Sequence, residues 1–123
     1  ITPDMPFPSV ACSVQEGLGA RKAVCFDISG ACAGFVYAII TAQQFIACGT
    51  CRNALVIGSE KLSAITDWQD RNTCVLFGDG AAAAVLSEVK SGGIISHYMA
   101  GDGTMKELLM LPDCANRRPR RKP

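Results

Sequence analysis

The sequence predicts an α/β fold in which apolar strands alternate with helices. Three stretches support this prediction: a long uncharged helix pattern over Ala33–Cys48, a continuous apolar run at Asn53–Glu60, and a strand-like run at Ala81–Val89. A continuous apolar run with a polar end is typical of a buried parallel strand. The chain has 123 residues, which is enough for one domain at most. Of these residues, 49% are hydrophobic and 19% are charged, which is typical of a globular protein with an apolar core.

The first predicted helix begins after Ser9, because three prolines exclude helix before it and serine is a favourable N-cap. Its apolar edge would be formed by Val10, Val14 and Leu18. Gly17 and Gly19 would end it. A short β-like run at Ala23–Ile28 is the first predicted strand.

The second predicted helix, Ala33–Cys48, has an apolar stripe broad enough to be buried on more than one side, and Gly49 would stop it. Leu62–Trp68 reads as a short helix or a loop. A turn at Ser91–Gly93 predicts a hairpin between Ala81–Val89 and a further strand, Ile94–Met99. Glu107–Leu111 would form one more short strand.

Cys32 lies where the first predicted strand turns into the second helix, among Gly30, Ala31, Ala33 and Gly34. Small neighbours tolerate a strained turn, and a helix N-terminus presents free N–H groups and the positive end of its dipole. Both favour the thiolate, which is the nucleophilic form of cysteine. Cys32 could therefore carry an acyl group as a thioester. The alternative is that Cys32 is a small buried core residue.

Five segments occur in an order and spacing that resemble one enzyme family: Phe7–Ser9, Ser29–Phe35, Leu55–Glu60, Asp70–Thr73 and Phe77–Ala81. The family is β-ketoacyl-acyl-carrier-protein synthase III, within the thiolase-like superfamily. The resemblance runs from about Ile1 to Pro112. Five motifs in register are far more specific than any one of them.

The resemblance implies a partial thiolase-like fold of α-β-α-β-α layers, mostly the first half-domain, in which the helix after Cys32 is buried between two sheets. Residues 1–112 would form this partial domain, and residues 113–123 would be a basic, disordered tail. Whole synthases of this kind are more than twice as long, so we expect the chain to be a piece of a longer protein. A truncation or a shifted reading frame would explain the abrupt basic tail.

The resemblance also implies an acyltransferase. Cys32 would take an acyl group from an acyl-coenzyme A primer and condense it with malonyl-acyl carrier protein to start fatty acid synthesis. The backbone N–H of Cys32 would supply half of an oxyanion hole. The histidine and asparagine that assist decarboxylation lie in a part of the family's sequence outside this chain, so we expect this polypeptide alone to be inactive in condensation.

Five further residues match positions that line the substrate tunnel in the family. Arg71 would lie at its mouth and bind coenzyme A, since a guanidinium can pair with phosphate or stack on adenine. Phe7 would reach across a dimer interface into the partner's acyl pocket, and Leu62, Phe77 and Leu109 would line the pocket. The alternatives are an exposed loop arginine and four ordinary core residues.

The expected partners are acyl-coenzyme A, malonyl-acyl carrier protein and, for the complete enzyme, a second copy in a homodimer. No cofactor, metal, nucleic acid or membrane is expected, and the expected location is the cytoplasm, or the plastid stroma in a plant or alga. Two alternatives stay open. One is a related polyketide-type or hydroxymethylglutaryl-coenzyme A synthase, and the other is a non-catalytic fragment that only dimerises.

Three competing site types are disfavoured. Cys48 and Cys51 form a C-x-x-C pair, but at a helix C-terminus, where the dipole opposes thiolate, and no partner completes a zinc site. Gly78–Ala83 matches a dinucleotide-binding pattern, but a strand is expected where that pattern needs a helix. His97, the single histidine, lies in a predicted strand, so it is not assigned to Cys32 as a catalytic partner.

Charge and cysteine usage agree with an enzyme in a reducing compartment. Five of the twelve basic residues lie in the last seven positions, which leaves seven basic against eleven acidic residues elsewhere and no nucleic-acid footprint. The seven cysteines do not form a paired framework, so reduced thiols are expected. The uncharged stretch 28–51 is long enough for a membrane span, but Gln43 and Gln44 interrupt it and a buried helix explains it better.

Overall fold

The computed structural model describes residues 1–111, so the predicted tail at 113–123 lies outside the described residues. Its regular elements are two helices and two strands: α1 (Val10–Gly17), α2 (Gly34–Ala47), β1 (Asn53–Lys61) and β2 (Asp79–Ser87). Short 3₁₀ turns occupy Ala31–Ala33, Leu62–Ala64 and Gly103–Leu108. The described part is therefore a partial α/β domain, as predicted for a thiolase-like fragment.

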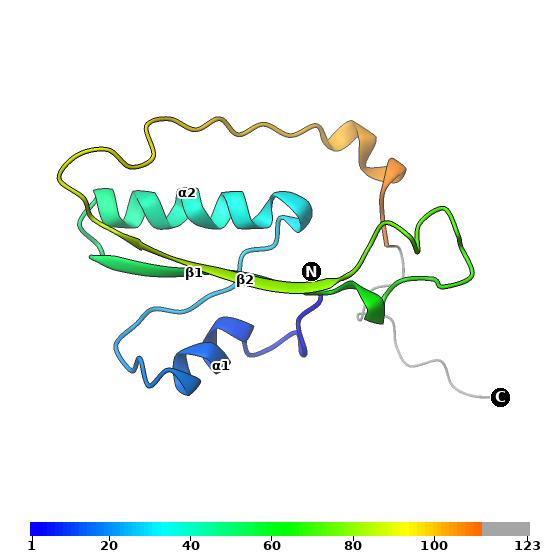
Figure 1. Ribbon diagram of the computed structural model, residues 1–123, viewed down its shortest axis with the longest axis horizontal. Coiled ribbons are helices and arrows are strands. Elements are labelled where there is room, and N and C mark those ends of the chain that lie inside the picture. The colour runs from blue at the N-terminus through cyan, green and yellow to red at the C-terminus, as the bar shows by residue number, and fades with distance from the viewer. Residues whose placement is uncertain (112–123) are drawn as a thin grey trace.

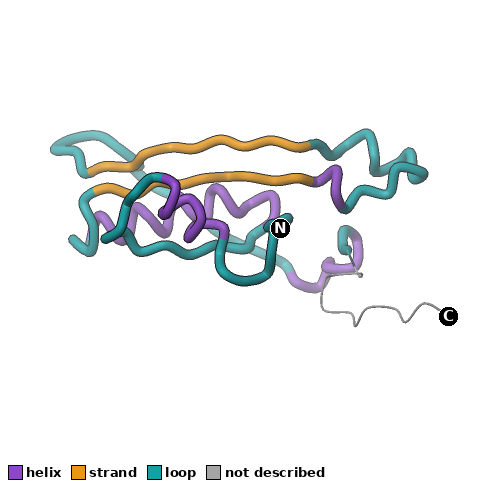
Figure 2. Tube along the Cα trace, turned by 90° about the horizontal axis from the view of Figure 1, so that it is seen from below, coloured by secondary structure: helices purple, strands orange, loops and turns teal. Residues whose placement is uncertain are grey.

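The two strands form one antiparallel sheet, whose register runs from Asn53 opposite Ser87 to Lys61 opposite Asp79. Helix α2 lies along one side of this sheet, and α1 lies on the other side with the N-terminal segment (Figure 1). Seen from below, the strands run side by side for their whole length, with the long 62–78 connection at one end (Figure 2). The sheet thus separates the two helices.

The core lies between α2 and the sheet. Alternate residues of β1 are more buried, and Val56 is 5% exposed. The period of two places Val56 and Gly58 on the same face. A Cβ built on Gly58 would lie 3.2 Å from a ring carbon of Phe35 on α2, which places this face against the helix. From the helix, Ile40 and Ala42 complete the buried apolar set of the described residues.

The local predictions for both helices and both long strands are confirmed. The first helix begins right after Ser9 and ends at Gly17, and α2 matches the predicted Ala33–Cys48 within one residue at each end. The strand predicted at Ala81–Val89 is present but begins and ends two residues earlier. The Leu62–Trp68 connection contains a short 3₁₀ turn. Periodicity and glycine positions were sufficient for these elements because both signals are local.

The predicted pairing of the strands was wrong. Strand β1 was expected to be parallel and β2 to form a hairpin with Ile94–Met99, but β1 and β2 pair antiparallel with each other. After β2 the chain turns back over the side of α2 that faces away from the sheet (Figure 1). The Gln43 side chain there donates a hydrogen bond to the Ile94 carbonyl at 3.2 Å. Ile94–Met99 therefore lies alongside helix α2 and does not pair with a strand.

Two other predicted strands are also absent. Ala23–Ile28 is irregular, and Val24 within it is 85% exposed, although the Phe26 ring meets the Phe45 ring of α2 edge to face, with centroids 6.1 Å apart. The region predicted as a strand at Glu107–Leu111 overlaps the 3₁₀ turn that ends at Leu108 and continues without regular structure. A strand needs a hydrogen-bonding neighbour, and neither segment has one in the described chain.

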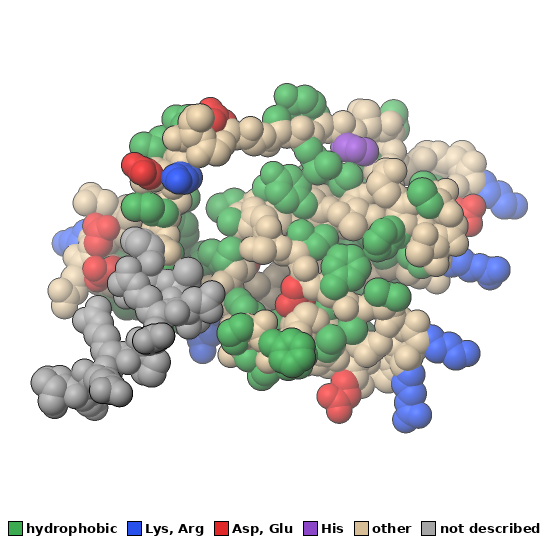
Figure 3. Space-filling model, turned by 180° about the vertical axis from the view of Figure 1, so that it is seen from behind, with side chains coloured by type: hydrophobic (Ala, Val, Ile, Leu, Met, Phe, Trp, Pro, Cys, Tyr) green, Lys and Arg blue, Asp and Glu red, His purple; other side chains and the backbone are tan. Residues whose placement is uncertain are grey.

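Helix α2 is covered less completely than predicted. The side toward the sheet is buried, but Val36 is 51% and Phe45 is 40% exposed, because the second sheet implied by the resemblance does not occur within residues 1–111. Apolar side chains lie open over much of the face in Figure 3. Large exposed apolar areas are characteristic of surfaces that other parts of a protein cover. Among the described residues, no helix is long and apolar enough to cross a membrane.

Candidate active site

Cys32 lies in a tight turn directly before α2. The turn is closed by a hydrogen bond of 3.1 Å from the Ala33 N–H to the Gly30 carbonyl. Ala31 has φ of +46°, in the left-handed region that side chains with a Cβ rarely occupy. Such strain persists at functional sites, where the surrounding structure holds it. The strained turn expected from the small residues around Cys32 is confirmed, and alanine instead of glycine carries the strain.

The turn leaves Cys32 exposed at the start of a fourteen-residue helix. No side chain caps the N-terminus of α2, although its first N–H, that of Gly34, donates to the Ala31 carbonyl of the preceding 3₁₀ turn. The helix dipole stabilises negative charge at this end of the helix. An exposed sulfur at such a position is suited to act as a nucleophile.

Gly30 packs the turn against α2. Its own backbone angles, φ −142° and ψ 14°, do not require glycine, but a Cβ at this position would lie 2.6 Å from the Tyr37 ring and 3.0 Å from the Gly34 Cα. The Tyr37 contact could not have been read from the sequence. It explains why the smallest residue is needed two positions before Cys32.

Gly30→Ala is expected to lower the free energy of unfolding by about 1–3 kcal/mol, the usual cost of overpacking. Gly34→Ala is the matched control, since Gly34 has helical angles and a Cβ there would meet nothing within 4 Å. Because alanine is favoured over glycine inside helices, the control should keep or slightly raise stability. Urea unfolding followed by circular dichroism measures both, and equal destabilisation would refute the steric account.

The segment before Cys32 is fixed to α1 by Asp27. Its carboxylate accepts hydrogen bonds from the backbone N–H groups of Val10 and Ala11, at 2.8 and 2.9 Å. The Ser9 side chain makes no such cap, although Ser9 occupies the N-cap position as predicted. Asp27 therefore does the capping from seventeen residues away in sequence, and it anchors the segment that leads to Cys32.

Arg71 lies in a turn at the end of the sheet where β1 finishes and β2 begins. Asp70 organises this turn: its carboxylate accepts from the Asn72 N–H at 3.0 Å and from the Thr73 hydroxyl at 2.8 Å. These two bonds hold the pKa of the Asp70 carboxyl below its usual value, so the carboxylate that organises the turn is ionised at neutral pH. The Arg71 side chain is exposed and free to meet a ligand from solvent.

The four residues assigned to the acyl pocket occupy different elements. Leu62 begins the 3₁₀ turn after β1 and is partly buried, as is Phe77 just before β2. Phe7 is 86% exposed in the N-terminal segment, and Leu109 is 69% exposed after the last 3₁₀ turn. Their role in an acyl pocket stays a prediction.

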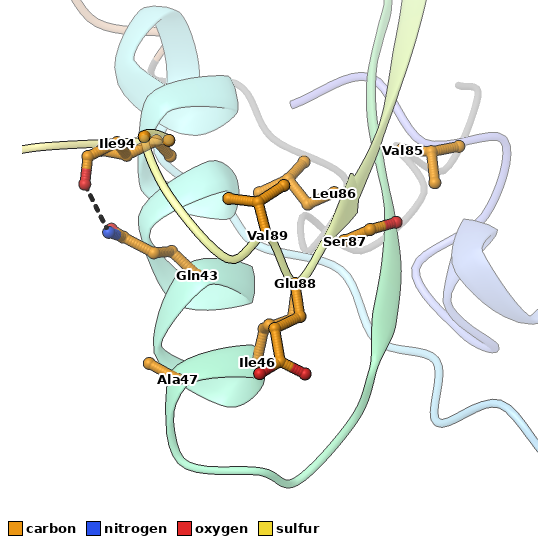
Figure 4. A pocket seen from close by; sticks show the side chains of 11 residues that line it. Gln43, Ile46, Ala47, Val85, Leu86, Ser87, Glu88, Val89 and Ile94 are labelled. Atoms are coloured by element: carbon orange, nitrogen blue, oxygen red, sulfur yellow. Dashed lines mark hydrogen bonds between the residues drawn. The ribbon is translucent and has the colours of Figure 1, made fainter.

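A hollow of about 580 Å³ lies elsewhere, between the C-terminal half of α2, the end of β2 and the following turn (Figure 4). Its lining includes Gln43, Ile46, Leu86, Val89 and Ile94, and none of the predicted pocket residues. The side-chain amide oxygen of Gln43 (Oε1) is buried there without a hydrogen-bond partner among the described residues. The hollow is thus distinct from the residues that the sequence assigned to substrate.

The structure bears on two of the disfavoured site types. Gly80–Ala83 lies within strand β2, which contradicts the helix that a dinucleotide site requires there. Among residues 1–111, no group of three or more histidine, cysteine, aspartate or glutamate residues could hold a metal ion. His97 is exposed, and the strand predicted around it is absent.

Comparison with known proteins decides the family. The family model described as 3-Oxoacyl-[acyl-carrier-protein (ACP)] synthase III matches residues 26–103, a segment that contains both Cys32 and Arg71. The chain belongs to this synthase III family. A curated relative, the β-ketoacyl-[acyl-carrier-protein] synthase III of Caldanaerobacter subterraneus subsp. tengcongensis, is 56% identical over 120 residues, which are 97% of this chain and 36% of the relative.

Solved structures agree with the family assignment. The synthase III of Thermus thermophilus matches with a TM-score of 0.87 and 41% identity, over 97% of this chain and 37% of that one. The priming β-ketosynthase of the R1128 polyketide biosynthetic pathway matches with a TM-score of 0.73 and 36% identity, over 76% of this chain and 28% of that one. The chain thus spans about a third of the length of its relatives and has the partial thiolase-like fold of a synthase III fragment.

Proposed function

We propose that the complete protein is a β-ketoacyl-acyl-carrier-protein synthase III that works through an acyl thioester on Cys32. The single observation that carries this proposal is the exposed Cys32 in a strained turn at the uncapped N-terminus of α2, within a chain that belongs to the synthase III family. This geometry suits attack on a thioester carbonyl, because the helix end stabilises the sulfur as an anion before attack and after release.

In the proposed reaction, the Cys32 thiolate attacks the carbonyl carbon of an acyl-coenzyme A primer, and the coenzyme A thiolate leaves. Malonyl-acyl carrier protein then loses carbon dioxide, and the carbanion so formed attacks the acyl-Cys32 carbonyl. The bond to sulfur breaks, which releases the β-ketoacyl product and restores the thiolate. The backbone N–H of Cys32 would donate to the oxyanion in both attacks. The histidine and asparagine that assist decarboxylation, and the second oxyanion donor, would come from outside residues 1–123.

The remaining assignments follow from the family. The substrates would be acyl-coenzyme A and malonyl-acyl carrier protein, with no cofactor, and the complete enzyme would be a cytoplasmic homodimer. Phe7 would enter the partner's acyl pocket, which agrees with its 86% exposure here. Leu62, Phe77 and Leu109 would line the pocket once the rest of the fold surrounds them.

A chimera tests the proposal directly. Residues 1–111 of this chain replace the matched segment of the Caldanaerobacter synthase, which supplies the rest of the fold. We expect acetyl-coenzyme A to acylate Cys32 and the chimera to form a β-ketoacyl product with malonyl-acyl carrier protein, as mass spectrometry of the enzyme and of the carrier protein would show. A folded chimera that is not acylated at Cys32 would refute the proposal. The isolated chain should form no condensation product.

A polyketide-type priming synthase is the second candidate, because the R1128 priming β-ketosynthase matches this fold. Both candidates use the same cysteine chemistry, so they differ in the carrier protein that they accept. Parallel assays of the chimera with fatty-acid and polyketide carrier proteins separate them. A dimerising fragment without catalysis predicts instead that Cys32 reacts no faster than the other thiols of the chain.

Arg71→Ala in the chimera is expected to raise the KM for acyl-coenzyme A about ten- to a hundredfold, since loss of a charge-assisted hydrogen bond costs about 1.5–3 kcal/mol and each 1.4 kcal/mol is tenfold. The rate at saturation should change little. Arg52→Ala is the matched control, because Arg52 is also exposed but precedes β1 at the opposite end of the sheet. Steady-state kinetics with varied acyl-coenzyme A measure both, and equal effects would exclude a specific role for Arg71.

A further inference from the structure

Two cysteines outside the candidate active site face each other. Cys12 lies on α1 and Cys25 lies in the irregular segment that follows it, and their sulfur atoms are 3.2 Å apart. The Ser9 hydroxyl lies 3.1 Å from the same Cys12 sulfur. Both thiols are partly buried, so they are shielded but within reach of a small reagent. A disulfide has an S–S bond of about 2.05 Å, so a modest rotation of the side chains would join the two sulfurs.

The backbone around these thiols is held in place by hydrogen bonds between the same two segments. The Asp27 carboxylate caps α1 at Val10 and Ala11, and the Gln15 side chain donates to the Ala23 carbonyl at 2.5 Å. These contacts flank Cys25 on both sides in sequence. The approach of the sulfurs is therefore imposed by the fold and does not depend on the thiols themselves.

The surroundings distinguish the two thiols. The hydrogen bonds from Ser9 and from the Cys25 thiol lower the pKa of Cys12, whereas the hydrogen bond to Cys12 and burial raise the pKa of Cys25. Because Asp27 caps α1, the Ser9 hydroxyl is free to form a hydrogen bond with the Cys12 sulfur. Cys12 thus resembles an attacking thiol and Cys25 a resolving thiol that keeps its proton.

We propose that Cys12 and Cys25 form a redox-reactive dithiol that closes to a disulfide when it meets hydrogen peroxide. The Cys12 thiolate attacks one peroxide oxygen, the O–O bond breaks, and after proton transfer Cys12 is a sulfenic acid and one water is released. The Cys25 sulfur then attacks the Cys12 sulfur, the S–O bond breaks, and the Cys25 proton leaves with the oxygen as a second water. Two thiols are oxidised by two electrons, and the peroxide is reduced to two waters.

The proposed disulfide would join α1 to the segment that leads into the active-site turn, because Cys25 precedes Cys32 by seven residues. Cys32 itself would not be consumed. The linkage is a further property of the chain and does not rest on the proposed condensing function, since Ser9, Cys12 and Cys25 are not among the residues assigned to substrate.

The folded chain and the unfolded chain favour different first disulfides. Closing a loop costs more entropy as it lengthens, so an unfolded chain favours the nearby Cys48 and Cys51 over Cys12 and Cys25. In the structure, the close thiol contact lies between Cys12 and Cys25. The identity of the first disulfide therefore reports whether the fold positions this dithiol.

The test treats the reduced 123-residue chain and, separately, the chimera with one equivalent of hydrogen peroxide, then blocks free thiols with N-ethylmaleimide and maps disulfides by peptide mass spectrometry. We expect the Cys12–Cys25 linkage to predominate under native conditions in at least one of the two proteins and to lose its advantage in guanidinium. A predominant Cys48–Cys51 linkage, a statistical mixture or oxidation of Cys32 first, in both proteins, would overturn the proposal.

Two variants separate the roles of the thiols and of Ser9. In Cys12→Ser, no disulfide should form at Cys25, which should stay open to alkylation. In Ser9→Ala, the disulfide should still form, but alkylation of Cys12 by iodoacetamide at neutral pH should slow severalfold, since the thiolate loses a hydrogen bond. The helix keeps its Asp27 cap in this variant. An unchanged alkylation rate of Cys12 in Ser9→Ala, or a disulfide at Cys25 in Cys12→Ser, would refute the assignment of Cys12 as the attacking thiol.

Discussion

Replacing Cys32 by alanine in the chimera should reduce condensation, measured as kcat/KM, by more than about a thousandfold. Alanine has no atom that can accept the acyl group, so the covalent route is lost and not merely slowed. Cys32→Ser should lose nearly as much, because a hydroxyl stays protonated at neutral pH and is a far weaker nucleophile than a thiolate. Product formation and the mass of the acylated enzyme measure both variants.

Cys48→Ala is the matched control for this prediction. Cys48 is also an exposed cysteine and lies at the opposite end of the same helix, where the dipole does not favour an anion. Its removal should leave the rate within about twofold, as for a surface substitution. If both alanine variants lost activity equally, or if Cys32→Ala retained it, the active-site assignment would be wrong.

The position of Cys32 could be predicted because its signals are local. Gly30 and Gly34 mark a turn, and the uncharged run after it marks a buried helix start. Neither signal depends on where the rest of the chain lies. The structure confirms the turn and shows how it is held, through Ala31 at positive φ and Gly30 against Tyr37.

Strand pairing could not be predicted, because pairing depends on segments far apart in sequence. Ala23–Ile28 and Ile94–Met99 have strand-like composition, but no neighbouring strand within residues 1–111 pairs with them. Strands β1 and β2 pair across the 62–78 connection, which is too long to be recognised in the sequence as a hairpin turn. Composition indicates what could be a strand, and the available partners decide what becomes one.

Polar contacts that fix the site were missed for a similar reason. Sequence reasoning assigns the cap of α1 to Ser9, the adjacent residue, whereas Asp27 provides it after the chain folds back. The same fold-back brings Cys25 to Cys12. A carboxylate or a thiol has no sequence signal for a partner thirteen or more residues away, so only the structure reveals these contacts.

Ile40→Ala should lower the free energy of unfolding of the 123-residue chain by about 2–5 kcal/mol, the usual cost of truncating a buried isoleucine. Ile40 is 5% exposed and is one of only three buried apolar residues within the described part. Natural domains are stable by about 5–15 kcal/mol, so this loss is a large share for a chain with so small a core. The midpoint of urea unfolding, followed by circular dichroism, measures it.

Ile95→Ala is the matched control, because Ile95 is 95% exposed and undergoes the same chemical change. Its effect should stay within about 0.5 kcal/mol. Equal effects of the two substitutions would mean that α2 does not pack on the sheet as the structure shows. In the chimera, Ile40→Ala should reduce the amount of folded enzyme but leave the KM for acyl-coenzyme A unchanged, whereas Arg71→Ala should do the reverse. The two variants therefore separate the core that supports Cys32 from the residue proposed to bind its substrate.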